Sequence, residues 1–170
     1  FDPLDLANQL RDNDIFLDFT EAPEMLHALL DKCTASILEL EAHLRAHYLE
    51  EYDFPGFSMG CWVSAGNYLS CDIGDMIAPP TLATFGIPYT QRILDAWGGA
   101  FLHHHELGLH QIENWSHCRN LAVQHMNRDP NTRHLGEEGV MTDALLESSF
   151  RVPLSFIVTY PEFVLGAERW

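Results

Sequence analysis

Basic residues are scarce in this chain. Its 170 residues include nine Lys and Arg against 25 Asp and Glu, which gives a formal net charge of −16. A surface of this kind repels nucleic-acid backbones and anionic membrane surfaces over most of its area. We therefore expect neither a nucleic acid nor a membrane as the partner, and the composition favours a small-molecule ligand.

The chain also lacks a membrane-scale apolar run, a secretion signal and paired CxxC cysteines. Its first residues, from Phe1 to Leu4, lead directly into a helical pattern. Its four cysteines are Cys33, Cys61, Cys71 and Cys118. They are scattered over segments with helix, strand and loop patterns, and this is not the spacing of a disulfide framework. We therefore expect a folded protein of the reducing cytoplasm.

Helical and strand-like patterns alternate along the rest of the chain. Apolar residues at helical spacing cover 4–11, 22–51, 79–97 with an interruption near Pro88, 111–115, 139–150 and 161–170. Strand-like runs cover 57–63, 68–73, 100–103, 120–126 and 153–159. The pattern predicts one α/β domain, with a helical lead-in over 1–56 and successive βα units over 57–170, whose parallel strands are joined by helical crossovers. No GxGxxG or GxxxxGK[ST] motif follows any strand, which argues against a nucleotide-binding doubly wound sheet.

Three consecutive histidines end the strand that begins at Ala100. Reactive groups of parallel α/β proteins gather at the carboxyl ends of strands, so His103, His104 and His105 are the first candidates. The period of two along a strand sends His103 and His105 to one face and His104 to the other. The first pair can share acid–base work or bind a metal, although zinc needs three or four converging ligands and the sequence offers no obvious third.

Asp72 is the second candidate, because a carboxylate directly after an apolar run can be partly buried and act in catalysis. An equally good interpretation is that Asp72 and Asp75 cap the helix that starts near Pro79. Four further strand-end residues are candidates for substrate binding: Tyr68, His125, Asn127 and Tyr160. The competing interpretations are aromatic packing for the two tyrosines and an ordinary turn over 127–131.

Several of these segments together resemble the uroporphyrinogen decarboxylase-like superfamily. The stretch 71–89, CDIGDMIAPPTLATFGIPY, is similar to a family segment with an acidic strand end, an (I/L)SPE motif, a phenylalanine and LPY. The run 100–105, AFLHHH, falls where the family has its next strand, which ends in His-x-Cys in the zinc-dependent corrinoid methyltransferase branch. The region 5–44 is similar to the helices that precede these segments.

The resemblance implies the C-terminal half of a TIM-type (β/α)₈ barrel, which explains why 170 residues fall short of the roughly 250 of a complete barrel. It implies a decarboxylase-like lyase for a small carboxylated substrate, with Asp72, His103 and His105 as catalytic residues and no required cofactor. The alternative is a methyltransferase with a His103-x-His105 zinc site and a corrinoid partner. His105 replaces the cysteine of that branch, and the strand after Pro153 offers no cysteine ligand.

A third hypothesis is a binding module that keeps the barrel architecture without its chemistry. Half of a barrel has two open sheet edges, and unpaired edges promote association of chains. We therefore predict that the isolated chain dimerises or aggregates through these edges.

Overall fold

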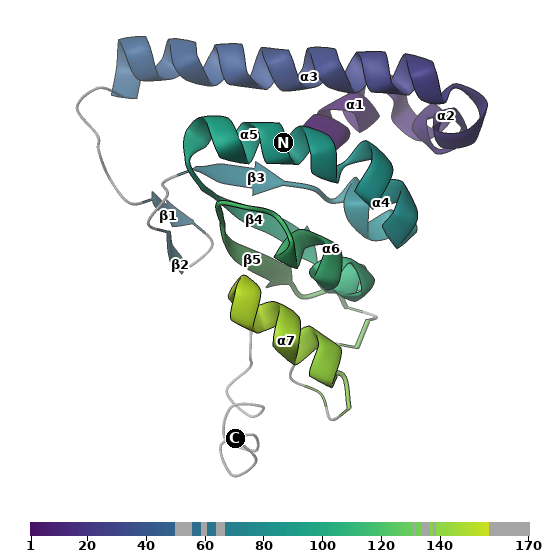
Figure 1. Cartoon of the computed structure of the whole chain (residues 1–170), viewed down its shortest axis with the longest axis vertical. Helices are drawn as coiled ribbons and strands as arrows, with labels where there is room; N and C mark the ends of the chain where they lie inside the picture. Colours follow the sequence, from purple (N-terminus) through teal and green to yellow (C-terminus); the bar gives the residue numbers. More distant parts are fainter. Residues whose placement is uncertain are drawn as a thin grey trace.

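A parallel sheet forms the centre of the molecule. The computed structural model describes residues 1–49, 56–58, 61–63, 67–130, 132–133, 137 and 139–156. Within this part, the four parallel strands are β3 (Tyr68–Ser70), β4 (Ala100–His105), β5 (Leu121–Asn127) and β6 (Leu154–Phe156). They lie in the sheet in the order in which they follow one another along the chain (Figure 1). The predicted α/β class with parallel strands is confirmed.

Helices precede the sheet and connect its strands. The lead-in consists of α1 (Pro3–Arg11), α2 (Ile15–Glu21) and α3 (Pro23–Leu44), with single helical turns at Asp12–Asp14 and Arg45–Leu49. The connections contain α4 (Pro79–Phe85) and α5 (Ile87–Trp97) before β4, α6 (Ile112–Ser116) before β5 and α7 (Asp143–Arg151) before β6, with 3₁₀ turns at Ile73–Met76 and Glu106–Gln111. In Figure 1, α5 lies between the long α3 helix and the sheet.

A small antiparallel pair stands apart from this sheet. It joins β1 (Gly56–Ser58) to β2 (Cys61–Val63). The run 57–63 was expected to contribute a strand, and it does contain strand residues, but they pair with each other rather than with β3. In the described residues, the parallel βα units therefore begin at β3.

Several predicted helix boundaries need correction. The helical pattern over 79–97 is divided at Gly86, and Pro88 lies in the first turn of α5, where its missing N–H costs nothing. The helix expected from residue 139 starts at Asp143, because the Thr142 hydroxyl caps it by accepting from the Leu145 N–H at 3.2 Å. The helix expected over 22–51 is present as α3 from Pro23 to Leu44 and continues in a helical turn over Arg45–Leu49, and residues 50 and 51 lie outside the described residues. The predicted helix over 161–170 lies outside the described residues.

The alternation of side chains along β4 divides the sheet into two faces. Ala100 and Leu102 point into the main core, together with Leu69 of β3 and Leu94 of α5. All four are buried, and full burial of one leucine side chain contributes about 2 kcal/mol to stability. The main core thus lies between the sheet and the helices, and it leaves the odd-numbered residues of β4 to the opposite face.

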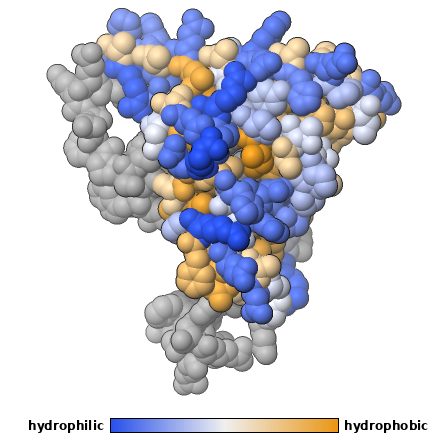
Figure 2. Space-filling model, viewed as in Figure 1, coloured by the Kyte–Doolittle hydropathy of each residue, from blue (hydrophilic) through white to orange (hydrophobic). Residues whose placement is uncertain are grey.

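A second, smaller core cluster lies beside α7, where Ile112 and Met126 pack with Val140. Figure 2 shows apolar side chains at the surface near this end of the molecule, where Leu146 and Phe150 of α7 are exposed. No helix in the described part of the chain combines the length and the apolar character that a membrane crossing requires.

Candidate functional site

The parallel register brings polar side chains into rows across one face of the sheet. Ser70, His103 and His125 are paired residues on β3, β4 and β5, and His105 pairs with Asn127 in the next row on this face. Because paired residues of a parallel sheet share a face, these rows place the odd-numbered histidines of β4 together. Asp72 follows Ser70 by two residues and continues the chain toward the same end of the sheet.

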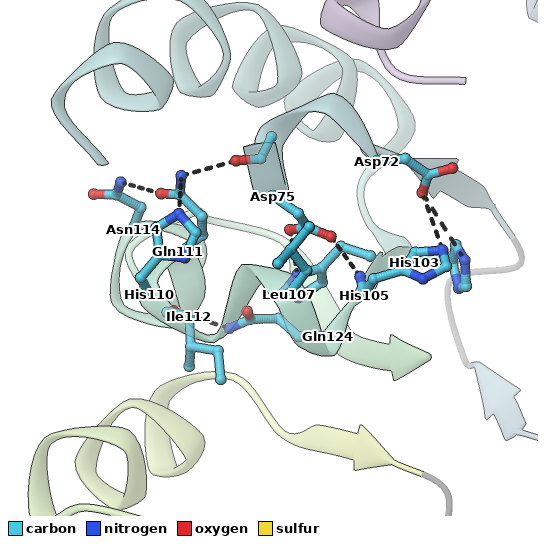
Figure 3. A network of polar contacts seen from close by, with 12 residues as sticks. Asp72, Asp75, His103, His105, Leu107, His110, Gln111, Ile112, Asn114 and Gln124 are labelled. Carbon is cyan, nitrogen blue, oxygen red and sulfur yellow. Dashed lines mark hydrogen bonds and ion pairs between the residues drawn. The ribbon is translucent and has the colours of Figure 1, made fainter. Parts of the chain in front are cut away.

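Asp72, His103 and His105 converge at this carboxyl end. The Asp72 Oδ1 atom lies 4.0 Å from His103 Nε2 and 3.8 Å from His105 Nε2 (Figure 3). One ligand atom from each of the three residues lies within 4.8 Å of the other two. The Asp72 side chain is 55% exposed while His103 is buried, so the group is open on the carboxylate side.

The second ring nitrogens of both histidines have partners of their own. His103 Nδ1 lies 2.9 Å from His125 Nδ1, and His105 Nδ1 lies 2.8 Å from Asp129 Oδ1. In each ring, Nδ1 therefore contacts a residue outside the group of three, and Nε2 faces the space beside Asp72. This division of roles is typical of histidines that bind a metal ion through one nitrogen.

Asp72 is held in place by β3 and by α1. Its Oδ1 atom accepts a hydrogen bond from the Ser70 hydroxyl at 3.0 Å. Its backbone N–H donates to Asp5 Oδ2 at 3.1 Å, and the N–H of Ile73 donates to Asp5 Oδ1 at 3.0 Å. The Asp5 carboxylate thus anchors the start of the turn that presents Asp72.

Asp75 fixes the end of β4 from the opposite face. Its Oδ2 atom accepts from the backbone N–H of His105 at 2.6 Å (Figure 3). Its Oδ1 atom lies 3.2 Å from His104 Nδ1. Gly108 passes so close that a Cβ atom there would lie 1.7 Å from Asp75 Oδ1. Only glycine permits this approach of the backbone to the buried carboxylate.

Aromatic rings stack beside the histidines on this face of the sheet. Tyr68 stacks on Phe101 and on His103, and Phe101 and His103 each stack on His125. Burial lowers the pKa of His103, and burial together with the neighbouring His103 lowers the pKa of His125 to about 4. Both rings are therefore neutral near pH 7, which is the form in which imidazole binds metals.

The positions predicted from the sequence are correct for several of these residues. His103 and His105 share a face, and His104 is fully buried on the other side, near Trp115. The helix-cap interpretation of Asp72 is wrong, because Ala78 occupies the N-cap of α4 and Asp72 makes no side-chain cap hydrogen bond.

The candidate substrate-binding residues have different positions. Tyr68 and His125 lie in the ring stack, with Tyr68 at its exposed edge, and His125 is buried against His103. Asn127 ends β5 and is half-buried in the row of His105. Tyr160 lies outside the described residues.

Three residues around the site were missed or given another role. The sequence offered no obvious third ligand beside His103 and His105, and the structure brings a carboxylate oxygen of Asp72, which follows β3, within 4.8 Å of one nitrogen of each. Asp129 lies two residues beyond β5, in a segment that reads as an ordinary turn. Asp5, which is 67 positions from Asp72 in the sequence, accepts a hydrogen bond from the backbone N–H of Asp72. Strand-end position is a signal that could have found Asp129, whereas no local pattern marks Asp5.

A second group of possible ligands lies nearby and is fully buried. It consists of Asp2, Asp5 and Cys71. Asp2 accepts from the Asp5 N–H at 2.8 Å and from the Thr90 hydroxyl at 2.9 Å. Burial raises the pKa of Asp2, and burial together with the charge of Asp2 raises the pKa of Asp5 to about 7. Because its carboxylates are occupied by donors of the protein, this group ties α1 to β3 and α5.

The comparisons with known proteins identify no relative: no protein-family model, no curated protein and no solved structure matches this chain. The chemistry of the site therefore has to be argued from its own residues.

Proposed function

We propose that the chain is part of a metal-dependent barrel enzyme, with Asp72, His103 and His105 as the ligands of a divalent metal ion. The observation that carries this proposal is the convergence of one carboxylate oxygen and two imidazole nitrogens within 4.8 Å. Two histidines and one carboxylate that leave coordination positions open are typical of catalytic zinc and of non-haem iron sites.

The distances favour a metal over direct proton transfer between these groups. Asp72 Oδ1 is 3.8 and 4.0 Å from the two Nε2 atoms, which exceeds the length of an N–H···O hydrogen bond. Ligand atoms around an ion that is roughly 2.0–2.2 Å from each can lie this far apart. The metal-free relay that the resemblance implies has no short contact to support it among these three residues.

The outer contacts fit a metal site as well. Asp129 engages the second nitrogen of His105, His125 engages that of His103, and Ser70 donates to Asp72. Ligands of metal ions are commonly held by such partners, which set the ring orientation and the protonated nitrogen. Every proposed ligand thus has a hydrogen-bonded neighbour that orients it.

The order of the strands supports the barrel. In a (β/α)₈ barrel, successive parallel strands are neighbours, and the active site lies at their carboxyl ends. Strands β3 to β6 follow this order, and the proposed ligands lie at the ends of β3 and β4. The resemblance of segments 71–89 and 100–105 to motifs of the uroporphyrinogen decarboxylase-like superfamily is a further reason for this proposal.

The substrate class we propose is a small carboxylated molecule, and the reaction class is that of a carbon–carbon lyase. A bound divalent ion acts as a Lewis acid on an oxygen of the substrate. It also outweighs the charge of Asp72, so that an anionic group is attracted to a chain of net charge −16. The exposed edge of Tyr68, beside His103, forms a wall for the substrate.

A second candidate is methyl transfer with a corrinoid partner, favoured by the position of the metal ligands at the end of β4. Asp72 would complete a three-ligand site with these histidines, but His105 stands where the methyltransferase branch has a cysteine. A carboxylate donates less charge to a metal than a thiolate does, so this ligand set suits polarisation of oxygen better than activation of a thiol. The lyase therefore remains the first proposal.

Zinc titration of the purified protein tests the metal centre. We expect one Zn²⁺ per chain by calorimetry and elemental analysis, and loss of this binding in the double variant His103→Ala/His105→Ala. The control is His117→Ala, which removes an exposed histidine that is not one of the proposed ligands. Equal zinc binding by the double variant and the control would exclude this centre. Metal-stimulated release of CO₂ from small carboxylic acids then distinguishes the lyase from a binding module.

A further inference from the structure

Asp129 contacts two different parts of the candidate site. Its Oδ1 atom lies 2.8 Å from His105 Nδ1, and its Oδ2 atom accepts from the backbone N–H of Leu107 at 3.1 Å. His105 ends β4 and Leu107 lies in the turn that follows it. One carboxylate, two residues beyond β5, thus holds both the ring of a proposed ligand and the backbone next to it.

Local structure fixes Asp129 itself. Its carbonyl oxygen accepts from the hydroxyl of Thr132 at 3.3 Å and from the N–H of Thr132 at 3.5 Å. Pro130 follows directly and restricts the backbone of Asp129 to extended conformations. The half-buried carboxylate is therefore presented by a constrained turn rather than by a long free side chain.

The contact with His105 determines which nitrogen of the ring carries the proton. A carboxylate oxygen can only accept, so the hydrogen bond at 2.8 Å requires a proton on Nδ1. In the neutral ring, Nε2 then has a free lone pair. This nitrogen is the one that lies 3.8 Å from Asp72 Oδ1.

We infer that Asp129 is a positioning residue that holds His105 in the tautomer and ring orientation required for metal binding through Nε2. This inference rests on the proposed metal centre for its functional meaning. Asp129 does not itself approach the space between the three ligands, because its carboxylate oxygens are engaged by His105 Nδ1 and by Leu107. It acts on the metal through His105.

The test compares Asp129→Ala and Asp129→Asn with the control Asp95→Asn, which changes an exposed acid on α5 that pairs with Arg119. Long-range ¹H–¹⁵N NMR of the metal-free protein near pH 7.5 reports the protonated nitrogen of each imidazole. A His105→Gln variant identifies the signals of His105. We expect a proton on Nδ1 in the wild type and a mixture of tautomers in Asp129→Ala. Asp129→Asn should keep the wild-type tautomer, because the amide oxygen still accepts from Nδ1.

Zinc affinity provides the second readout, measured by competition with a chromophoric chelator. Loss of an outer partner of a metal-bound histidine weakens binding by about 10- to 100-fold. We expect a loss of this size in Asp129→Ala, a smaller loss in Asp129→Asn and no change in Asp95→Asn. A wild-type tautomer together with wild-type affinity in Asp129→Ala would overturn the inference.

The two readouts separate this inference from the proposed function. If the wild type binds no zinc, the metal centre is wrong, but the NMR experiment still decides whether Asp129 controls the tautomer of His105. If zinc binds and the tautomer of His105 does not depend on Asp129, only the role of Asp129 is wrong. Should Asp129→Ala fail to fold, Asp129→Leu, which has a side chain of similar size and no acceptor, takes its place: a wild-type tautomer together with wild-type zinc affinity in that variant would overturn the inference.

Discussion

The chain contains two groups of three potential metal ligands, and they differ in what their polar atoms already bind. Asp2, Asp5 and Cys71 are buried, and both carboxylates accept hydrogen bonds from the protein. In the other group, the Asp72 carboxylate is open to solvent and faces the Nε2 atoms of His103 and His105 without a short contact to either. We call the first group the buried latch and the second the open centre.

The difference shows that proximity of ligand atoms does not by itself indicate a metal site. A buried carboxylate whose two oxygens each accept a hydrogen bond from the protein gains less from an ion than do nitrogen and oxygen atoms that face one another across an open space without a short contact. The latch therefore serves the fold, and the open centre is the candidate for chemistry. Four measurements sharpen or break this comparison.

The largest expected effect is on zinc affinity. Asp72→Ala removes one of the three proposed ligands. We expect zinc affinity to fall by about 100-fold or more, because removing a residue that only orients a ligand already weakens binding by up to about 100-fold. Asp2→Ala changes the latch and should leave the zinc dissociation constant within about threefold of the wild type, because Asp2 contacts none of the ligands. Calorimetric titration of both variants measures the difference. Comparable losses in the two variants would mean that the groups are not separate.

The second effect is on stability. Asp2→Ala leaves the N–H of Asp5 without its side-chain acceptor in a buried place, while the Thr90 hydroxyl keeps the carbonyl oxygen of Gly86 at 3.3 Å. An unsatisfied buried group costs about 1–3 kcal/mol, so we expect the free energy of unfolding to fall by roughly 1–3 kcal/mol. Urea denaturation followed by circular dichroism measures this change. A loss below about 1 kcal/mol would contradict the structural role of the latch.

The third effect is a pH dependence of the latch. The pKa of Asp5 is about 7 in the folded protein, against an ordinary value of 3.8, because burial and the charge of Asp2 oppose ionisation. Between these values the folded state binds more protons than the unfolded state, so the free energy of unfolding falls as pH rises from about 4 to 7.

This dependence is checked by denaturation at several pH values. Asp5→Asn should show a smaller fall over this window than the wild type does. Asp12→Asn, which changes an exposed acid at the end of α1, serves as the matched control. An unchanged pH profile in Asp5→Asn would show that Asp5 does not carry the extra proton.

The smallest effect is that of Asp72→Ala on the stability of the metal-free protein. The side chain is 55% exposed, and within the described part of the chain the donor that its carboxylate contacts at hydrogen-bond distance is the Ser70 hydroxyl. Substitutions at such positions usually change the free energy of unfolding by no more than about 0.5 kcal/mol. Thermal unfolding in the presence of a chelator measures it. A destabilisation of several kcal/mol would place Asp72 in the structural core rather than in an open centre.

Much of the strand and helix arrangement could be predicted from local patterns. Strands at 100–105 and 121–127 and the break near Pro88 follow from apolar runs and from backbone restrictions that act over a few residues. The short helix α2 was missed. The antiparallel pairing of β1 with β2 could not be predicted, because a short apolar run does not specify its partner.

The candidate site was predictable only in part. Strand alternation placed His103 and His105 on one face, and strand-end position identified Asp72. The hydrogen bonds from Asp5 to Asp72 and from His105 to Asp129 join residues that are 67 and 24 positions apart. Nothing in the local sequence specifies such contacts, because they depend on how the elements pack.

The sequence by itself therefore determined the α/β class and the division of the histidines between two faces of a strand. Both follow from the backbone geometry of a strand, in which side chains alternate whatever the rest of the chain does. Only the tertiary structure decided that Asp72 meets His103 and His105 in a group of three potential ligands and that the carboxylates of the buried latch accept hydrogen bonds from the protein instead. These outcomes depend on strand register and on which donors packing brings to each carboxylate, and both are set by contacts between residues far apart in the chain.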